Sequence, residues 1–250
     1  MGVLRVTRVV KIGSRVLTTA DGQLDLNQMR QLVSDIMAAQ KFDGSPVVLV
    51  SSGAIICGSG VLNSPVNTLP EKQAAAAVGQ GVLMAEYRQF FRDFGLSVAQ
   101  ILVTQDSFEN PEKRHNIKNT LDALLAKQVI PIINENDTVS TAEINLGDND
   151  QLASLTARLI TASQLILLSD VDGVYGANGQ VITELNSQLV SIDSLVDDAR
   201  RCVSNGGMRS KLLAAYDAVA ANIAVTIANG STPNVIMRAV KNHNIGTQII

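Results

Sequence analysis

The sequence predicts an α/β protein in which helices cover both faces of a largely parallel β-sheet. Short runs rich in Val and Ile alternate along the chain with longer stretches of helical periodicity. The short runs carry few polar residues, which is typical of strands buried on both faces. On this basis strands are expected at residues 6–12, 46–51, 97–103, 129–134, 165–169, 224–227 and 246–250.

The segments between the predicted strands support this arrangement. Pro46 and Pro131 stand at or near strand starts, where a missing N–H is tolerated. No Pro- or Ser-rich linker divides the chain, so one domain spanning residues 1–250 is expected, with two lobes of one sheet meeting near residues 150–165. Helices are expected at residues 27–40, 71–94, 112–127, 149–161, 191–202 and 207–221.

Composition excludes several classes of protein. With 46% hydrophobic and 17% charged residues in 250, the chain has the composition of a folded globular protein. A net charge of −3 argues against a broad nucleic-acid surface. No apolar run approaches the roughly 20 residues that span a bilayer, and neither a signal peptide nor a zinc-binding cluster is evident. We expect a cytoplasmic protein, with Cys57 and Cys202 as reduced thiols.

Two predicted strands end in small residues where parallel sheets bind ligands. The first carries Lys11 and ends at Gly13 and Ser14, and the second ends at Ser52 and Gly53. Neither segment is a P-loop or a dinucleotide fingerprint, so an ordinary tight turn remains the simpler interpretation of either glycine alone. Lys11 lies in an otherwise apolar strand, where an ammonium either meets an anion or extends to the surface.

A second lysine stands near a helix start. Lys211 follows Gly206 and Gly207, and the positive end of the helix dipole disfavours a cation there. A phosphate bound between the glycines and the lysine would resolve this conflict. The strand at residues 165–169 leads to Asp170 and Tyr175, which either contact a nucleotide or form a polar turn.

The stretch IINENDTVSTAEINLGDND, residues 132–150, crowds acids and amides around one glycine. It is either a polar turn or part of a pocket for a small charged substrate. Its candidate binding residues are Asn134, Asp137, Asp148, Asn149 and Asp150.

Taken in order, these motifs resemble the glutamate 5-kinase branch of the amino acid kinase family over essentially all 250 residues. The resemblance implies a three-layer αβα sandwich with a central eight-stranded, mainly parallel sheet. It also implies that ATP phosphorylates the γ-carboxylate of L-glutamate to L-glutamyl 5-phosphate, the first step of proline biosynthesis. Residues 1–160, approximately, would bind the amino acid and residues 161–250 the nucleotide.

The resemblance also implies a role for each motif. Lys11 and Lys211 would straddle the transferring phosphoryl group, and Asp150 would orient them. Mg²⁺ would be held by the nucleotide phosphates and not directly by the protein. The residues expected to bind glutamate are Ser52, Gly53, Asn134, Asp137, Asp148 and Asn149. Those expected to bind ATP are Lys11, Gly13, Ser169, Asp170, Tyr175, Asn205, Gly206, Gly207, Met208, Arg209, Ser210 and Lys211.

The chain departs from the family pattern in places. Arg15 stands where a small residue is usual, and the chain is expected to lack the C-terminal PUA domain. L-Proline is expected as a feedback inhibitor, glutamyl phosphate reductase as the downstream enzyme and a homo-oligomer as the assembly, with no nucleic-acid or membrane partner. Two alternatives stay open: a kinase for N-acetylglutamate or aspartate, or a non-catalytic amino-acid sensor on the same fold.

Overall fold

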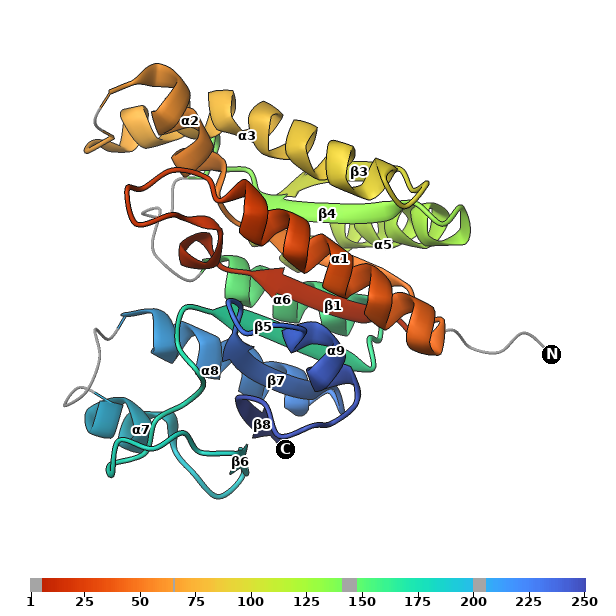
Figure 1. Ribbon diagram of the computed structural model, residues 1–250. Coiled ribbons are helices and arrows are strands. Elements are labelled where there is room, and N and C mark those ends of the chain that lie inside the picture. The colour runs from red at the N-terminus through yellow and green to blue at the C-terminus, as the bar shows by residue number, and fades with distance from the viewer. Residues whose placement is uncertain (1–5, 65, 141–147, 200–205) are drawn as a thin grey trace.

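A computed structural model of the protein describes residues 6–64, 66–140, 148–199 and 206–250. Their strands are β1 (Arg8–Ile12), β2 (Val47–Ser51), β3 (Val98–Val103), β4 (Ile130–Glu135), β5 (Gln164–Ser169), β6 (Glu184–Leu185), β7 (Ala224–Asn229) and β8 (Thr247–Ile249). They form one eight-stranded sheet in the order β3-β4-β2-β1-β5-β7-β8-β6 (Figure 1). The β7–β8 pair is antiparallel and the other neighbouring pairs are parallel. The predicted fold class is therefore confirmed.

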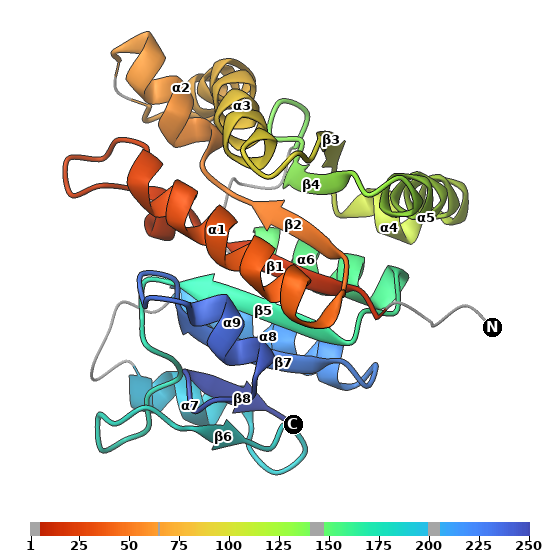
Figure 2. The ribbon, with the colours of Figure 1, turned by 45° about the vertical axis from the view of Figure 1, so that its right-hand side comes forward.

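Helices cover both faces of this sheet. One face packs against α1 (Leu26–Asp43), α3 (Leu69–Arg92) and α9 (Val235–Val240), and the other against α5 (Pro111–Ala126), α6 (Asp148–Leu159) and α8 (Gly206–Val219). Figure 2 shows α1 and α9 in front of the sheet and α6 and α8 behind it. Within the described residues, no helix has an apolar stretch long enough to cross a bilayer.

Strand alternation decides which face each residue of β1 reaches. Val10 and Ile12 pack into the apolar core beside α1, α3 and α9, whereas Val9 packs into the core beside α6 and α8. Because side chains alternate along a strand, Lys11 projects to the same face as Val9. The lysine therefore lies among residues of α6 and α8.

Some elements differ from the sequence prediction. β3 was expected to be buried on both faces, but it lies at the sheet edge and Gln100 and Leu102 are exposed. The prediction was wrong for this strand because the face that carries these two side chains borders a pocket and is not fully covered by a helix. The elements that were not predicted are short: η1 (Ser14–Leu17), α2 (Ala54–Leu62), α4 (Asp106–Glu109), β6 and α9. The predicted helix at residues 191–202 is observed as α7 (Ile192–Ala199), and residues 200–202 lie outside the described chain.

Two glycines allow α2 and α3 to pack with their backbones in contact. A Cβ on Gly58 would lie 1.8 Å from the carbonyl oxygen of Ala75, and one on Gly79 would lie 1.8 Å from that of Ala54. Neither obstacle is a flexible side chain, so relief requires the helices to move apart. Since Ala54 follows Gly53 at the end of β2, this contact also holds the start of α2 against α3.

Replacing Gly79 with alanine should therefore destabilise the fold by about 3 kcal/mol, because overpacking here forces backbone displacement. For a chain of this size that corresponds to a fall in Tm of about 10 °C, measured by thermal denaturation. Gly60→Ala is the matched control, since a Cβ at this exposed position in α2 has no atom within 4 Å. A Gly79→Ala melting curve that overlays the wild type would contradict the close contact.

Candidate active site

The carboxyl ends of the central strands lie side by side at one edge of the sheet. The register places Ile12 of β1 beside Ser51 of β2 and Leu168 of β5. Since these strands are parallel, the segments that follow them emerge together. This edge therefore gathers Gly13 after β1, Ser52 and Gly53 after β2, Asn136 and Asp137 after β4, and Asp170 after β5.

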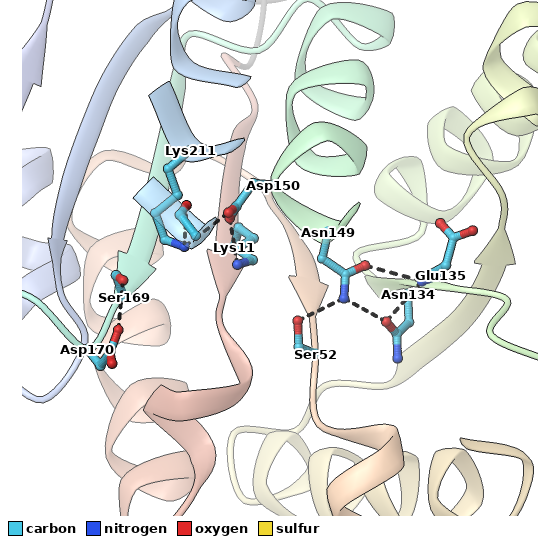
Figure 3. Close-up of polar contacts among 10 residues, drawn as sticks. Lys11, Ser52, Asn134, Glu135, Asn149, Asp150, Ser169, Asp170 and Lys211 are labelled. Atoms are coloured by element: carbon cyan, nitrogen blue, oxygen red, sulfur yellow. Dashed lines mark hydrogen bonds and ion pairs between the residues drawn. The ribbon is translucent and has the colours of Figure 1, made fainter. Parts of the chain in front are cut away.

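A buried cluster of three charges lies beside this edge (Figure 3). Asp150, near the start of α6, is fully buried between two lysines. Its Oδ1 lies 2.5 Å from Nζ of Lys11, and its Oδ2 lies 3.1 Å from Nζ of Lys211. One carboxylate thus faces two ammonium groups, which leaves a local excess of positive charge. The structure places Asp150 where an orienting role requires it, and that role stays a prediction.

Lys11 is a buried lysine, since the residue is 4% exposed, and so it is not a surface lysine with its ammonium in water. Burial lowers the pKa of Lys11 from its ordinary value; Asp150 opposes this shift, and the positive charge of Lys211 adds to it. An anion brought next to this ammonium would stabilise its charged form. The site is therefore built to accept additional negative charge.

The environment of Lys211 corrects one argument made from the sequence. A phosphate had been invoked to explain a cation near the start of α8. The structure supplies a negative partner within the chain, because Nζ of Lys211 contacts Asp150 and also donates to the carbonyl oxygen of Gly207 at 3.4 Å. Lys211 is thus stabilised without a ligand, and its position alone does not call for one.

Glycines shape the turns next to these charges. The backbone N–H of Gly13 donates to Leu168 at 3.2 Å, and a Cβ on Gly13 would lie 3.4 Å from Nζ of Lys11. The absence of a side chain keeps the approach to the ammonium open. Gly53 has φ of 112°, a left-handed conformation that disfavours other residues, and it caps the start of α2. This conformation fits a tight turn at Gly53, and its expected contact with the substrate stays a prediction.

A network of amides lies on the other side of Asp150 (Figure 3). Nδ2 of Asn149 donates to Oγ of Ser52 at 2.8 Å and to Oδ1 of Asn134 at 3.1 Å. The backbone N–H of Glu135 donates to Oδ1 of Asn134 at 2.9 Å and to Oδ1 of Asn149 at 3.3 Å. These bonds join the ends of β2 and β4 to the first turn of α6. The structure therefore brings three of the predicted glutamate-binding residues into contact.

Gln80 of α3 extends this network and was missed from the sequence. Nδ2 of Asn134 donates to Oε1 of Gln80 at 2.9 Å, and Gln80 is 8% exposed. The helical pattern of the sequence does contain an indication that Gln80 is buried. Gln80 follows Ala76 by four residues and precedes Leu83 by three, so it is a polar residue on the buried face of α3.

Asp137 lines a pocket of about 260 Å³ between α2, α3, β3 and the end of β4. Gln80, Glu135 and Asn136 line the same pocket, and its apolar wall includes Ala54 and Ala76. Asn149, Ser52 and Lys11 are not among the described lining residues. Gln80 and Glu135 therefore connect the pocket that contains Asp137 to the amide network beside the charges.

Ser169 and Asp170 lie at the end of β5, on the side of Lys11 opposite the amide network (Figure 3). Oγ of Ser169 donates to Oδ1 of Asp170 at 3.2 Å, and Nη1 of Arg15 lies 3.1 Å from Oδ2 of Asp170. Burial raises the pKa of Asp170, but its hydrogen bond to Arg15 and the neighbouring donors outweigh this and bring the pKa below its ordinary value. Arg15, the departure noted in the sequence, thus neutralises an acid beside the site.

The remaining candidates lie around α8 and its neighbours. Met208 packs against the apolar core beside α6 and α8, and Arg209 forms an ion pair with Asp193 of α7. Tyr175 forms a β-bridge with Val181. Of the others, Gly206, Gly207 and Ser210 lie in the first turns of α8, Asp148 begins α6, and Asn205 lies outside the described residues, as does the segment 141–147.

Comparison with known proteins gives consistent matches. The family model "Amino acid kinase family" matches residues 6–229. A glutamate 5-kinase of Trichlorobacter lovleyi is 41% identical over 96% of this chain, which spans 65% of that relative's length. A glutamate 5-kinase of Listeria monocytogenes serotype 4a is 38% identical, and there the chain spans 91% of the relative.

Solved structures show the same fold at low sequence identity. Carbamate kinase from Giardia lamblia, bound to AMP-PNP, has a TM-score of 0.70 at 18% identity, with 99% of each chain covered. UMP kinase from Bacillus anthracis has a TM-score of 0.66 at 16% identity, covering 98% of this chain and 96% of the other. The predicted αβα arrangement around an eight-stranded sheet is thus the fold of these two solved structures as well.

Proposed function

The chain belongs to the amino acid kinase family, and from this premise we propose that it phosphorylates the γ-carboxylate of L-glutamate with ATP. The product would be L-glutamyl 5-phosphate, which begins proline biosynthesis. The family predicted from the motifs is confirmed, and both relatives described above are named glutamate 5-kinases. The observation that carries the proposal is the buried Lys11–Asp150–Lys211 cluster beside an amide-lined substrate edge.

The charge cluster suits phosphoryl transfer to a carboxylate. A carboxylate is already a nucleophile at neutral pH, so the reaction needs no protein base. The reaction is difficult because two anions must approach each other. Fixed positive charges between the carboxylate and the phosphoryl group reduce this repulsion. Lys11 and Lys211 would lie on either side of the transferring group, and Asp150 would hold both ammonium groups in place without filling the space before them.

The amide network suits the carboxylate of glutamate. Because Oγ of Ser52 accepts from Asn149, the Ser52 hydroxyl proton is directed elsewhere, and we expect it to reach a carboxylate oxygen. Asp137 would accept from the α-ammonium group. An N-acetylated substrate has no ammonium for this carboxylate, and a sensor has no use for two lysines at the site, so neither of these alternatives is favoured. L-Aspartate does carry the ammonium, and the names of the two relatives favour L-glutamate over it.

The nucleotide would occupy the side of Lys11 formed by β5 and α8. Among the described residues, no three His, Cys, Asp or Glu side chains are grouped as metal ligands, and Asp150 is already paired with two lysines. This donor set fits Mg²⁺ that is held by the nucleotide phosphates, whose charge it would neutralise. Gly13, Ser169, Asp170, Tyr175 and the start of α8 would contact the nucleotide, with Asn205 added from outside the described chain.

The strand order of the sheet supports two lobes, one that binds the amino acid and one that binds the nucleotide. Strands β3, β4, β2 and β1 form one half of the sheet, and β5, β7, β8 and β6 form the other. We assign the amino acid to residues 1–160, approximately, and the nucleotide to residues 161–250. Lys11 and Lys211 then belong to different lobes. Inhibition by L-proline, consumption of the product by glutamyl phosphate reductase and a homo-oligomeric state complete the proposal.

An ADP-release assay with L-glutamate, L-aspartate and N-acetylglutamate tests the proposed reaction. We expect kcat/KM for L-glutamate to exceed that for N-acetylglutamate by at least about 10²-fold, because the latter cannot pair with Asp137. Addition of L-proline should raise the apparent KM for glutamate. ADP release that prefers another acceptor would reassign the substrate, and binding of glutamate without ADP release would support the sensor.

A further inference from the structure

The orientation of the Gln80 amide is fixed by the protein backbone. The N–H of Glu135 can only donate, so the side-chain oxygens of Asn134 and Asn149 must face it. Asn134 therefore turns Nδ2 away, towards Gln80, which has to accept through Oε1. The amide of Gln80 cannot be reversed without placing two N–H groups against each other. Its Nε2 is consequently held at the far end of the network.

This Nε2 is a buried donor that has no hydrogen-bond partner within the described part of the chain. An unsatisfied buried N–H group is costly and needs an explanation, because folding removes it from water without replacing the hydrogen bond. Gln80 also lines the pocket that contains Asp137. An acceptor that enters this pocket would satisfy Nε2, so the cost of the unpaired donor favours binding of such a ligand.

The neighbouring amide cannot take this role. Nδ2 of Asn149 has two protons, and they are used by Ser52 and Asn134. An α-amino acid carries an ammonium and a carboxylate on one carbon atom, so its head group needs an acceptor and a donor close together. Asp137 and Gln80, lining one pocket, provide that combination.

We propose that Gln80 is a substrate-binding residue whose Nε2 donates to the α-carboxylate of the amino acid, beside the ammonium that binds Asp137. The proposal rests on the proposed function and adds a specificity residue to it. Gln80 thereby selects substrates that carry an α-carboxylate. The amide network sets its polarity, since Oε1 is occupied by Asn134 and the donors alone face the ligand.

The first test compares L-glutamate with 4-aminobutyrate, which has the same γ-carboxylate and ammonium but no α-carboxylate. In Gln80→Met, the KM for L-glutamate should rise by about 10- to 100-fold, the loss expected for a hydrogen bond to a charged group, with kcat and the KM for ATP within about twofold of the wild type. The inhibition constant of 4-aminobutyrate against glutamate turnover should stay within about twofold. Equal losses for both compounds would mean a structural role alone and would overturn the proposal.

The second test uses binding without turnover. Gln80→Glu keeps the shape and the acceptor for Asn134 but replaces the donor with a negative oxygen, so calorimetry should show L-glutamate binding weakened by about 100-fold or more. Gln89→Glu adds the same charge at an exposed position of the same helix and should bind as the wild type does. Undiminished binding by Gln80→Glu would overturn the proposal. Wild-type protein that fails to bind L-glutamate would instead reject the proposed function, so the two failures are distinguishable.

Discussion

Replacing Lys11 with alanine is expected to lower kcat by about 10²–10³-fold, the loss seen when one charge-stabilising donor is removed from an active site. The ammonium is buried and fixed by Asp150 at 2.5 Å, so no mobile side chain can substitute for it. The KM for glutamate should change less, because we propose that the amide network and Asp137, and not Lys11, hold the amino acid. Steady-state ADP release with varied glutamate and ATP separates the two constants.

Lys118→Ala is the matched control for this experiment. Lys118 is exposed and pairs with Asp122 one helical turn away, an interaction worth about 0.3–0.5 kcal/mol. Its removal should leave kcat and KM unchanged. A near-wild-type kcat for Lys11→Ala would reject the assignment of Lys11 to the transferring group. A change in glutamate KM alone would move Lys11 from phosphoryl transfer to substrate binding.

Replacing Asp150 with asparagine is expected to change both activity and stability. The amide keeps the shape of the carboxylate but leaves two ammonium groups without their shared counter-charge. Breaking a buried ion pair in this way costs about 3–5 kcal/mol, measured as the free energy of unfolding in urea at neutral pH. Asp122→Asn, which removes the exposed partner of Lys118, should cost less than about 1 kcal/mol.

The pH dependence of this variant has a definite sign. Burial lowers the pKa of Lys11, and Asp150 is the main influence that opposes the shift. Without Asp150 the pKa falls further, so the alkaline limb of the kcat profile should move to lower pH. The unfolded chain then binds more protons than the folded one, and the stability of Asp150→Asn should rise as pH increases towards the ordinary lysine pKa. An alkaline limb that moves upward would contradict the proposed coupling.

Much of the fold was predictable because strand signals are local. The runs of β-branched residues located β1, β2, β4, β5 and β7 to within about two residues. The pattern could not locate α2, whose nine residues include Gly58 and Gly60, or α9, whose six residues are too few to show a helical period. In α2, Gly58 is required for the close packing against α3 and lowers the helix propensity of the segment, so a propensity argument is misled there.

The candidate site was predictable to the extent that its residues stand in recognisable motifs. Lys11, Asp150 and Lys211 were named from the sequence, and the structure brings them together. Gln80 and the Arg15–Asp170 pair were not foreseen, because these contacts join positions 54 and 155 residues apart. A local sequence pattern carries no information on such pairings. The one indirect indication of the contact made by Gln80 was a polar residue on the apolar face of the helix that became α3.

The central place of β1 in the sheet also bears on how the chain folds. Arg8 pairs with Val47 on one side and with Gln164 on the other, so the strand that carries Lys11 gains its second neighbour from a segment more than 150 residues later. Contacts of such long sequence separation slow folding, because the intervening chain must first be closed into a loop. During synthesis, β1 stays half-paired until β5 has emerged. The lysine cluster can therefore form only late, when the two halves of the sheet have joined.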